Sequence, residues 1–205
     1  MAARGRPRSF DRDAKLRQAM ELFWERGYEG VSIGDLTGAL GLSPPSVYAA
    51  FGSKEQLFRE AIERYDADEG ALTARALEEQ PTARAAIEAM LRLNVAAYAD
   101  PTTPRGCMVV LAATNTTPAN AEISAFLADR RRSDRAAVLA RVRRGVADGD
   151  VPAHADAEAL AAFTSTVLEG LSLAARDGAT AAQMDAIVDV SMGAWDAQLA
   201  SPRAR

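Results

Sequence analysis

The stretch that decides the fold is residues 32–54, which read SIGDLTGALGLSPPSVYAAFGSK. Ser32 and Asp35 have the spacing of a capping box, with aspartate in place of glutamate, so a helix is expected to begin here. Gly41 follows the apolar positions and supplies a stop, because glycine readily adopts the left-handed conformation that commonly ends a helix. The pattern therefore predicts a short helix over residues 32–40.

A second short helix is expected after a tight turn. Ser43 is a favourable N-cap, and Pro44 occupies the first helical position, where its missing N–H costs nothing. Gly52 ends this helix, which we place at residues 44–51. Two amphipathic helices joined by a short glycine-containing turn are typical of a helix-turn-helix, and this favours DNA binding. The alternative is an ordinary pair of packed helices.

The side chains of this region divide into a buried face and an outer face. We expect the following apolar residues to form its core: Leu16, Met20, Phe23, Leu36, Leu40, Leu42, Val47 and Phe51. The residues left outside on the second helix are small, which lets a helix enter a major groove about 12 Å wide. Ser46 can bond a phosphate or a base edge, Tyr48 can reach the DNA backbone, and Lys54 can neutralise a phosphate.

The charge of the chain is unevenly distributed. The net charge is −4, which by itself argues against a nucleic-acid binder. Residues 1–17, however, hold six basic and two acidic side chains, whereas residues 66–205 hold 14 basic and 19 acidic ones. A basic tip on an acidic body is expected when only one end of a protein meets phosphate. A disordered, solubilising tail is the alternative reading of the same charges.

The densest resemblance to a known family lies between about residues 10 and 60. It is carried by the segments AMELFWERGYEGVSI (19–33), ALGLS (39–43) and FGSKE (51–55), together with Leu36, Val47, Tyr48 and Leu57. On these residues the chain resembles the TetR/AcrR family of one-component repressors. The rest of the chain is similar to that family in size and helix count, and residues 104–110 (PRGCMVV) resemble the helix-opening segment of one subgroup.

The resemblance implies a set of operator contacts. Residues that match Ser46, Tyr48 and Lys54 contact the operator in such proteins, with help from the start of the helix at 32–40. The predicted DNA-binding residues are Arg4, Arg6, Arg8, Ser32, Ser43, Pro44, Ser46, Tyr48, Ala49 and Lys54. Pro45 departs from the family pattern and removes one more donor from the first turn of the recognition helix. We therefore expect the N-terminal arginines to supply part of the affinity.

The whole chain is predicted to be all-α, because good helix formers dominate and no apolar residues alternate as in strands. Further helices are expected at about residues 11–26, 53–65, 66–79, 82–99, 106–115, 119–147, 156–176 and 180–199. We divide the chain into a basic flexible arm (1–9), a three-helix helix-turn-helix domain (10–53) and a larger helical domain for effector binding and dimerisation (54–205).

The larger domain is expected to pair with a second copy and to hold a ligand. Apolar stripes on the last two helices predict a dimer interface at Phe163, Val167, Leu171, Val188, Met192 and Trp195, although such stripes can also face the protein's own core. Apolar and polar side chains are expected to mix in a pocket for an apolar or amphipathic effector. Its predicted residues are Met90, Asn94, Tyr98, Cys107, Met108, Leu111, Asn115 and Phe126.

Cys107, the arginines of residues 130–144 and His154 each have both a structural and a functional interpretation. Cys107 is expected to be a small buried hydrophobe, or a redox or electrophile sensor if it is exposed with a lowered pKa. The arginines of residues 130–144 are expected to form a solvated helix face, with a second anion-binding surface as the alternative. His154 is the only histidine, so a nucleophile pair with Cys107 is disfavoured.

The sequence contains no motif typical of an enzyme, a metal site or a cofactor site. It also has no signal peptide and no apolar run long enough to span a membrane, and a cytoplasmic location is expected. The sequence thus predicts a dimeric, ligand-responsive transcriptional regulator, most simply a repressor that binds a near-palindromic operator and is released by a small molecule. A helical enzyme and a non-DNA interaction module are the alternatives.

Overall fold

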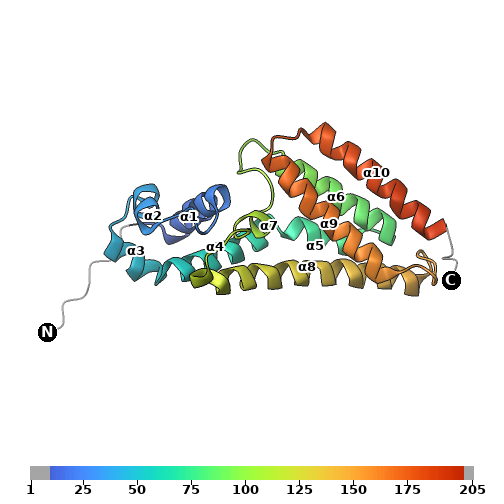
Figure 1. Ribbon diagram of the computed structural model, residues 1–205, viewed down its shortest axis with the longest axis horizontal. Coiled ribbons are helices and arrows are strands. Elements are labelled where there is room, and N and C mark those ends of the chain that lie inside the picture. The colour runs from blue at the N-terminus through green and yellow to red at the C-terminus, as the bar shows by residue number, and fades with distance from the viewer. Residues whose placement is uncertain (1–9, 201–205) are drawn as a thin grey trace.

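The computed structural model describes residues 10–200, and this part of the chain is helical without any strand (Figure 1). The helices are α1 (Arg12–Arg26), α2 (Ile33–Leu40), α3 (Pro44–Phe51), α4 (Lys54–Asp68), α5 (Ala71–Glu79), α6 (Ala83–Tyr98), α7 (Met108–Leu111), the 3-10 turn η1 (Pro118–Asn120), α8 (Ala121–Asp148), α9 (Ala157–Arg176) and α10 (Ala181–Ala200). The predicted all-α class is confirmed. Among these helices, none combines the length and apolarity that crossing a membrane requires.

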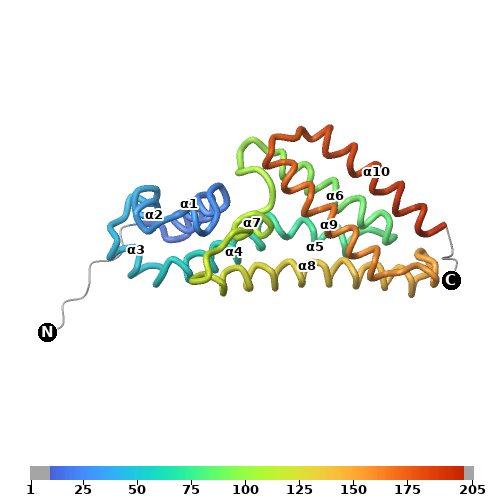
Figure 2. Tube along the Cα trace, in the orientation of Figure 1, coloured from blue at the N-terminus to red at the C-terminus, as the bar shows by residue number. Residues whose placement is uncertain are grey.

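The molecule is elongated, with α1, α2 and α3 at one end and α10 at the other (Figure 1). The long helix α8 runs beneath both halves, as the chain trace makes plain (Figure 2). The predicted helix-turn-helix is present with the expected ends. The Ser32 and Ser43 hydroxyls cap α2 and α3, and Gly41 has the left-handed φ of 61° between them. Local sequence signals therefore specify this turn.

Two predicted helices differ from the observed ones. The helix expected at residues 66–79 begins only at Ala71, because α4 continues to Asp68 before the chain bends. The helix expected at 106–115 is the single turn α7. Gly106 has a φ of 80°, and a Cβ there would lie 2.5 Å from the Ser172 carbonyl oxygen. The chain therefore passes close against α9 before any helix can start.

The apolar residues form two cores rather than one. The first unites α1, α2, α3 and α4 with α7 and the start of α8. Phe58 of α4 is fully buried in it, with its ring centroid 5.1 Å from that of Phe23 and 5.0 Å from that of Tyr28. Burying a side chain of this size contributes roughly 1.5–3 kcal/mol. Leu57, Phe58, Ala61, Ile62 and Tyr65 of α4 pack in this core, so the core extends past the domain boundary predicted at residue 54.

The second core fills the body between α5, α6, α8, α9 and α10. Four residues predicted for the dimer interface belong to it: Leu171, Val188, Met192 and Trp195. Each is at most 3% exposed, so these side chains pack mainly inside the protomer, and Trp195 also lines the groove beside Phe163. Both apolar stripes are wide enough to serve as core, and a role of these four residues in pairing stays a prediction. Phe163 stays 41% exposed and Val167 is partly buried.

The arginines of α8 form the expected solvated face only in part: Arg132, Arg135, Arg143 and Arg144 are exposed, whereas the other three are half-buried or buried. Arg130 pairs with Asp66 of α4 at 2.8 Å, and Arg131 donates to the Val109 carbonyl at 2.9 Å. Arg141 and Arg144 donate to carbonyls near the end of α5, namely those of Gln80, Leu77 and Glu78. Charged donors satisfy the terminal carbonyls of a helix that lacks its own partners. The arginines therefore link α8 to its neighbours.

Candidate functional site

The outer face of α3 is an open surface of small and aromatic side chains. Val47 and Phe51 point into the first core, where each is 3% exposed. The opposite side presents Ser43, Pro44 and Ala49 as exposed residues, and Tyr48 is 48% exposed. Ser46 lies between these two faces and is half-buried. The predicted recognition helix therefore offers the surface that a groove-binding helix needs.

The hydroxyls at the helix starts are held by local hydrogen bonds. Ser43 and Ser46 lie with their Oγ atoms 2.9 Å apart, and the Ser46 amide donates to the Ser43 Oγ at 3.4 Å. Ser32 accepts from the Asp35 amide at 3.1 Å, and the Asp35 carboxylate accepts from the Ser32 amide at 2.8 Å. These hydrogen bonds hold the side chains of Ser32 and Ser43 in place in the absence of a ligand.

Lys54 stands at the first position of α4, just after α3 ends. Its Nζ lies 4.0 Å from the centre of the Tyr28 ring, so the aromatic face attracts the cation. Partial burial lowers the pKa of Lys54, while the carboxylates of Glu29 and Asp35 act in the opposite direction. The lysine is thus positioned beside the α3 surface by packing from α1 and the turn after it.

The basic tip is partly neutralised within the fold. Arg12 pairs with Glu60 at 2.6 Å and donates to the Ala50 carbonyl at 3.2 Å. Arg17 lies 3.4 Å from Asp68. These two arginines brace α1 against α4, and they are less available to phosphate than the sequence suggested. The predicted contacts Arg4, Arg6 and Arg8 lie outside the described residues.

A cavity of about 140 Å³ lies in the body between α4, α5, α6, α8 and α9. Three predicted ligand residues line it: Asn94, Tyr98 and Cys107. The others do not. Met90 and Met108 are fully buried core residues, Leu111 is half-buried outside the lining, and Asn115 is exposed after α7. Phe126 packs under the Arg59 guanidinium, 4.5 Å from its ring centre. None of these five lines this cavity, and a role in ligand binding stays a prediction for all eight residues.

Several lining residues were missed by the sequence analysis. They are Tyr65, Asp66, Glu69, Thr73, Asp134, Ser165 and Glu169. Nothing in the local sequence of residues 66–70 indicates that this stretch meets residue 134 or residue 169. The one usable signal was the one-turn spacing of Tyr65 and Glu69, which puts both on the same face of a helix if α4 continues past Tyr65.

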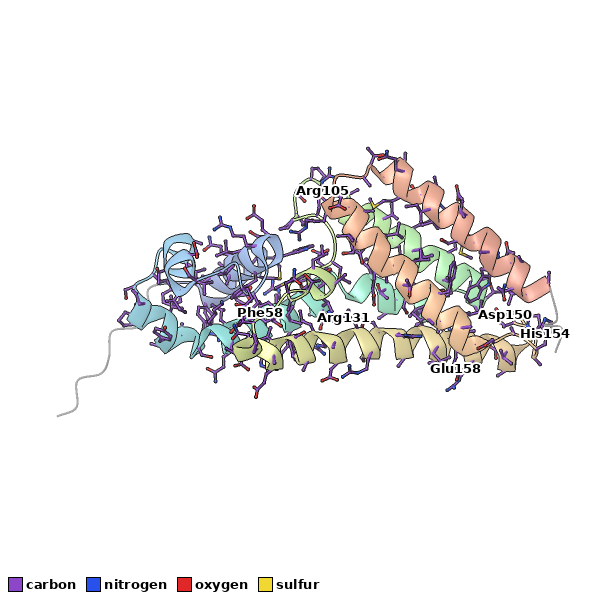
Figure 3. The ribbon with its side chains drawn as sticks, in the orientation of Figure 1. Phe58, Arg105, Arg131, Asp150, His154 and Glu158 are labelled. Atoms are coloured by element: carbon purple, nitrogen blue, oxygen red, sulfur yellow. The ribbon has the colours of Figure 1, made fainter. Side chains whose placement is uncertain are left out.

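Cys107 sits where the two cores meet and lines the cavity. Burial raises the pKa of its thiol, while a hydrogen bond with Tyr65 opposes that shift. Burial and the neighbouring thiol also hold the pKa of Tyr98 well above its usual value. His154 lies in an exposed loop at the far end of the body (Figure 3). The structure therefore provides neither an exposed, acidic thiol nor a Cys107–His154 pair.

The segment Arg105–Cys107 links this cavity to the N-terminal helices. The Cys107 amide donates to the Ser172 Oγ at 2.7 Å, and the Gly106 carbonyl accepts from the Trp24 indole at 2.8 Å. Arg176 of α9 donates to the Arg105 carbonyl at 3.1 Å, and to the carbonyls of Trp24 and Glu25 at 2.8 Å each. Figure 3 shows Arg105 beside this end of α9.

The end of α1 is thus fastened to the wall of the cavity. A second connection is α4 itself, which carries Lys54 at one end and lines the cavity with Tyr65 and Asp66 at the other. The cavity wall is therefore connected to the helices that carry the α3 surface in two ways: by hydrogen bonds to the end of α1 and by the continuous helix α4.

Comparisons with known proteins agree with this architecture. The family model described as "Bacterial regulatory proteins, tetR family" matches residues 16–61, and "Tetracyclin repressor-like, C-terminal domain" matches residues 83–190. The chain is 32% identical to the HTH-type transcriptional repressor ComR of Escherichia coli over 94% of this chain and 92% of the relative. It is 30% identical to the repressor BdcR of the same organism over 88% and 86%.

A solved structure is also similar over nearly the whole chain. It is a cysteine mutant of the TetR family transcriptional regulator CifR complexed with 26-bp double-strand operator DNA. The identity is 45%, the match covers 93% of this chain and all of that one, and the TM-score is 0.91. A putative TetR regulator from Rhodococcus is 39% identical over 93% of this chain, with a TM-score of 0.61.

Proposed function

The chain belongs to the TetR family of bacterial transcriptional regulators, and we propose that it represses genes by binding operator DNA through α3 and leaves the operator when its cavity is filled. The observation that carries this proposal is the open face of α3, flanked by Lys54, on a helix whose opposite side is locked into a core. Small exposed side chains let such a helix approach base edges, and the lysine neutralises a phosphate.

A single short helix reads few bases, so two copies are needed to contact a near-palindromic operator. The faces left for pairing are on α9 and α10, where large apolar side chains remain exposed: Phe163, Leu173, Ile187 and Val190. Beside Phe163 lies an apolar groove lined by Leu160 and Ala194. We infer that these residues form the dimer interface. Sedimentation as a single protomer at micromolar concentration would contradict it.

Release follows from a difference in affinity between two conformations. An effector that binds best to an arrangement with misplaced recognition helices draws the population away from DNA. The cavity touches α4 and Cys107, and both are tied to the DNA-facing end. The relatives of this chain are regulators, and we propose no chemical step for it.

The test is a titration of the purified protein against a fluorescent duplex taken from the DNA flanking its own gene. Lys54→Ala should weaken binding to all duplexes and reduce the slope of log affinity against log salt by about 1, since one phosphate contact is lost. Arg132→Ala is the matched control, because Arg132 is exposed on α8 and, within residues 10–200, pairs only with Asp129. Equal slopes for the two variants would remove Lys54 from the interface.

A further inference from the structure

The cavity is surrounded by more carboxylates than its cations neutralise. Asp66 comes from α4, Glu69 directly follows α4, Asp134 comes from α8 and Glu169 from α9. Among the residues from 10 to 200, only Asp66 of these four takes part in an ion pair, with Arg130 at 2.8 Å. Carboxylates from three helices thus meet at one site. Asp134 and Glu169 are exposed at its solvent-facing rim, and neither they nor Glu69 form an ion pair among the described residues.

The two arginines in the lining do not pair directly with the cavity carboxylates. Arg131 donates to the Val109 carbonyl, and neither Arg131 nor Arg135 forms an ion pair with a cavity carboxylate within the described part of the chain. Burial, together with the charges of Asp66 and Glu169, raises the pKa of Asp134 to about 6, and Arg130 only partly opposes this. A carboxylate in such surroundings gains from a cation brought by a ligand.

One polar group at the cavity lacks a hydrogen-bond partner among the described residues. The Ser165 hydroxyl oxygen is buried, lines the cavity on α9 and has no hydrogen-bond partner among the described residues. Buried hydroxyls in proteins are ordinarily hydrogen-bonded, so this one is suited to a ligand's polar group. The remaining wall is apolar or aromatic, with Val138, Leu168 and Tyr98 among its residues.

We propose that the effector is a small organic cation, a protonated amine on a compact apolar body, held by Asp134 and Glu169. An ammonium group donates three hydrogen bonds and needs no donor from the protein, which matches a site rich in carboxylates. The aromatic wall adds attraction for the cation, and the apolar wall accepts the body of the ligand. This inference rests on the proposed function, and it adds the chemical class of the molecule that causes release.

The cavity's arginines make an anionic effector the main rival, and a neutral one is the other. Benzylammonium, benzyl alcohol and benzoate share one ring and differ in charge, so they separate the three classes. Cyclohexylmethylammonium and butylammonium vary the apolar body. We expect calorimetric titration of the full-length protein to rank the ammonium compounds first. Equal affinities, tighter binding of benzoate, or no binding by any of the amines overturns the proposal.

Two substitutions on the same helix test where the cation sits. Asp134→Asn keeps the shape of the side chain and should weaken amine binding about tenfold, the effect of one partly screened charge pair. Asp129→Asn is the matched control, since Asp129 is exposed, pairs with Arg132 and lies outside the cavity. An Asp134→Asn variant with unchanged amine affinity contradicts the assignment.

The pH dependence has a definite sign. Asp134 takes up a proton as the pH falls through about 6, so amine affinity should drop between pH 8 and pH 5 in the native protein and stay flatter in Asp134→Asn. The cavity also holds other titratable or charged groups. They are Tyr65 and Asp66 of α4, Glu69 directly after α4, Tyr98 of α6, Cys107 directly before α7, three arginines of α8 (Arg130, Arg131 and Arg135) and Glu169 of α9. A native profile as flat as that of the variant counts against the role of Asp134.

Operator binding, measured in the same preparations, distinguishes a failure of the cationic-effector proposal from a failure of the proposed regulator function. Intact DNA binding without any preference for amines overturns the cationic effector and leaves the regulator in place. Amine binding without any affinity for the flanking DNA at low salt overturns the proposed function instead. Amine binding that also releases the duplex supports both.

Discussion

In the DNA-facing end, α2, α3 and α4 each begin at a serine whose hydroxyl accepts from the backbone amide three residues on. In the body, the wall of the cavity is closed by bonds between distant residues: Cys107 to Ser172, and Trp24 to Gly106. The first kind of contact is available to a peptide in isolation, whereas the second exists only after the chain has folded. The recognition surface is thus locally determined, and the effector site depends on long-range packing.

The largest effect is expected where the two regions meet. Gly106→Ala should destabilise the fold by about 3 kcal/mol, because the positive φ is strained and the new Cβ would overlap the Ser172 carbonyl. Gly149→Ala should cost only about 1 kcal/mol, since Gly149 has a φ of 85° but nothing within 4 Å of its Cβ. Urea unfolding measures both. Equal losses would mean that the close approach to α9 has no energetic weight.

A smaller effect is expected from removing the Arg176 side chain, which connects α9 to the end of α1, without changing a glycine of the backbone. Arg176→Ala removes three donors to main-chain carbonyls and should cost about 1–2 kcal/mol, because it leaves the end of α1 without its charged partner. It should also reduce how strongly an effector shifts operator affinity. Thermal unfolding and effector-dependent DNA titration check the two parts, with Arg132→Ala as the exposed reference. If the effector shifts operator affinity equally in the variant and in the native protein, Arg176 does not contribute to the coupling between the cavity and DNA binding.

The smallest effect is expected at a helix cap in the DNA-facing end. Ser43→Ala should destabilise by about 1 kcal/mol, because the first-turn amide of Ser46 loses its side-chain acceptor and keeps only the Ser43 carbonyl, whereas Ser43→Gly should cost only a few tenths. Both variants lose the same hydroxyl, so they should weaken DNA binding alike if Ser43 touches the operator. A glycine variant with native DNA affinity would limit Ser43 to capping. Urea unfolding and duplex titration give the two readouts.

The same contrast explains where prediction from the sequence succeeded. The ends of α2 and α3 are encoded by residues within four positions of each other, Ser32 with Asp35 and Ser43 with Pro44, and the structure has both helices where they were expected. The apolar stripes of α9 and α10 carry less information, because the same pattern serves a protomer core and a dimer interface. Leu171 and Trp195, predicted for the dimer interface, pack in the core of the protomer.

The sequence by itself determined the all-helical class, the helix-turn-helix and the family, since caps, glycine stops and apolar periodicity act over a few residues. Only the tertiary structure decided that α4 joins the N-terminal core, that Arg130 and Arg131 hold α8 to its neighbours, and that Asp134 and Glu169 share a cavity with Asp66. Those carboxylates lie on three helices far apart in the chain. The electrostatic character of the site is a property of helix packing, which no local pattern records.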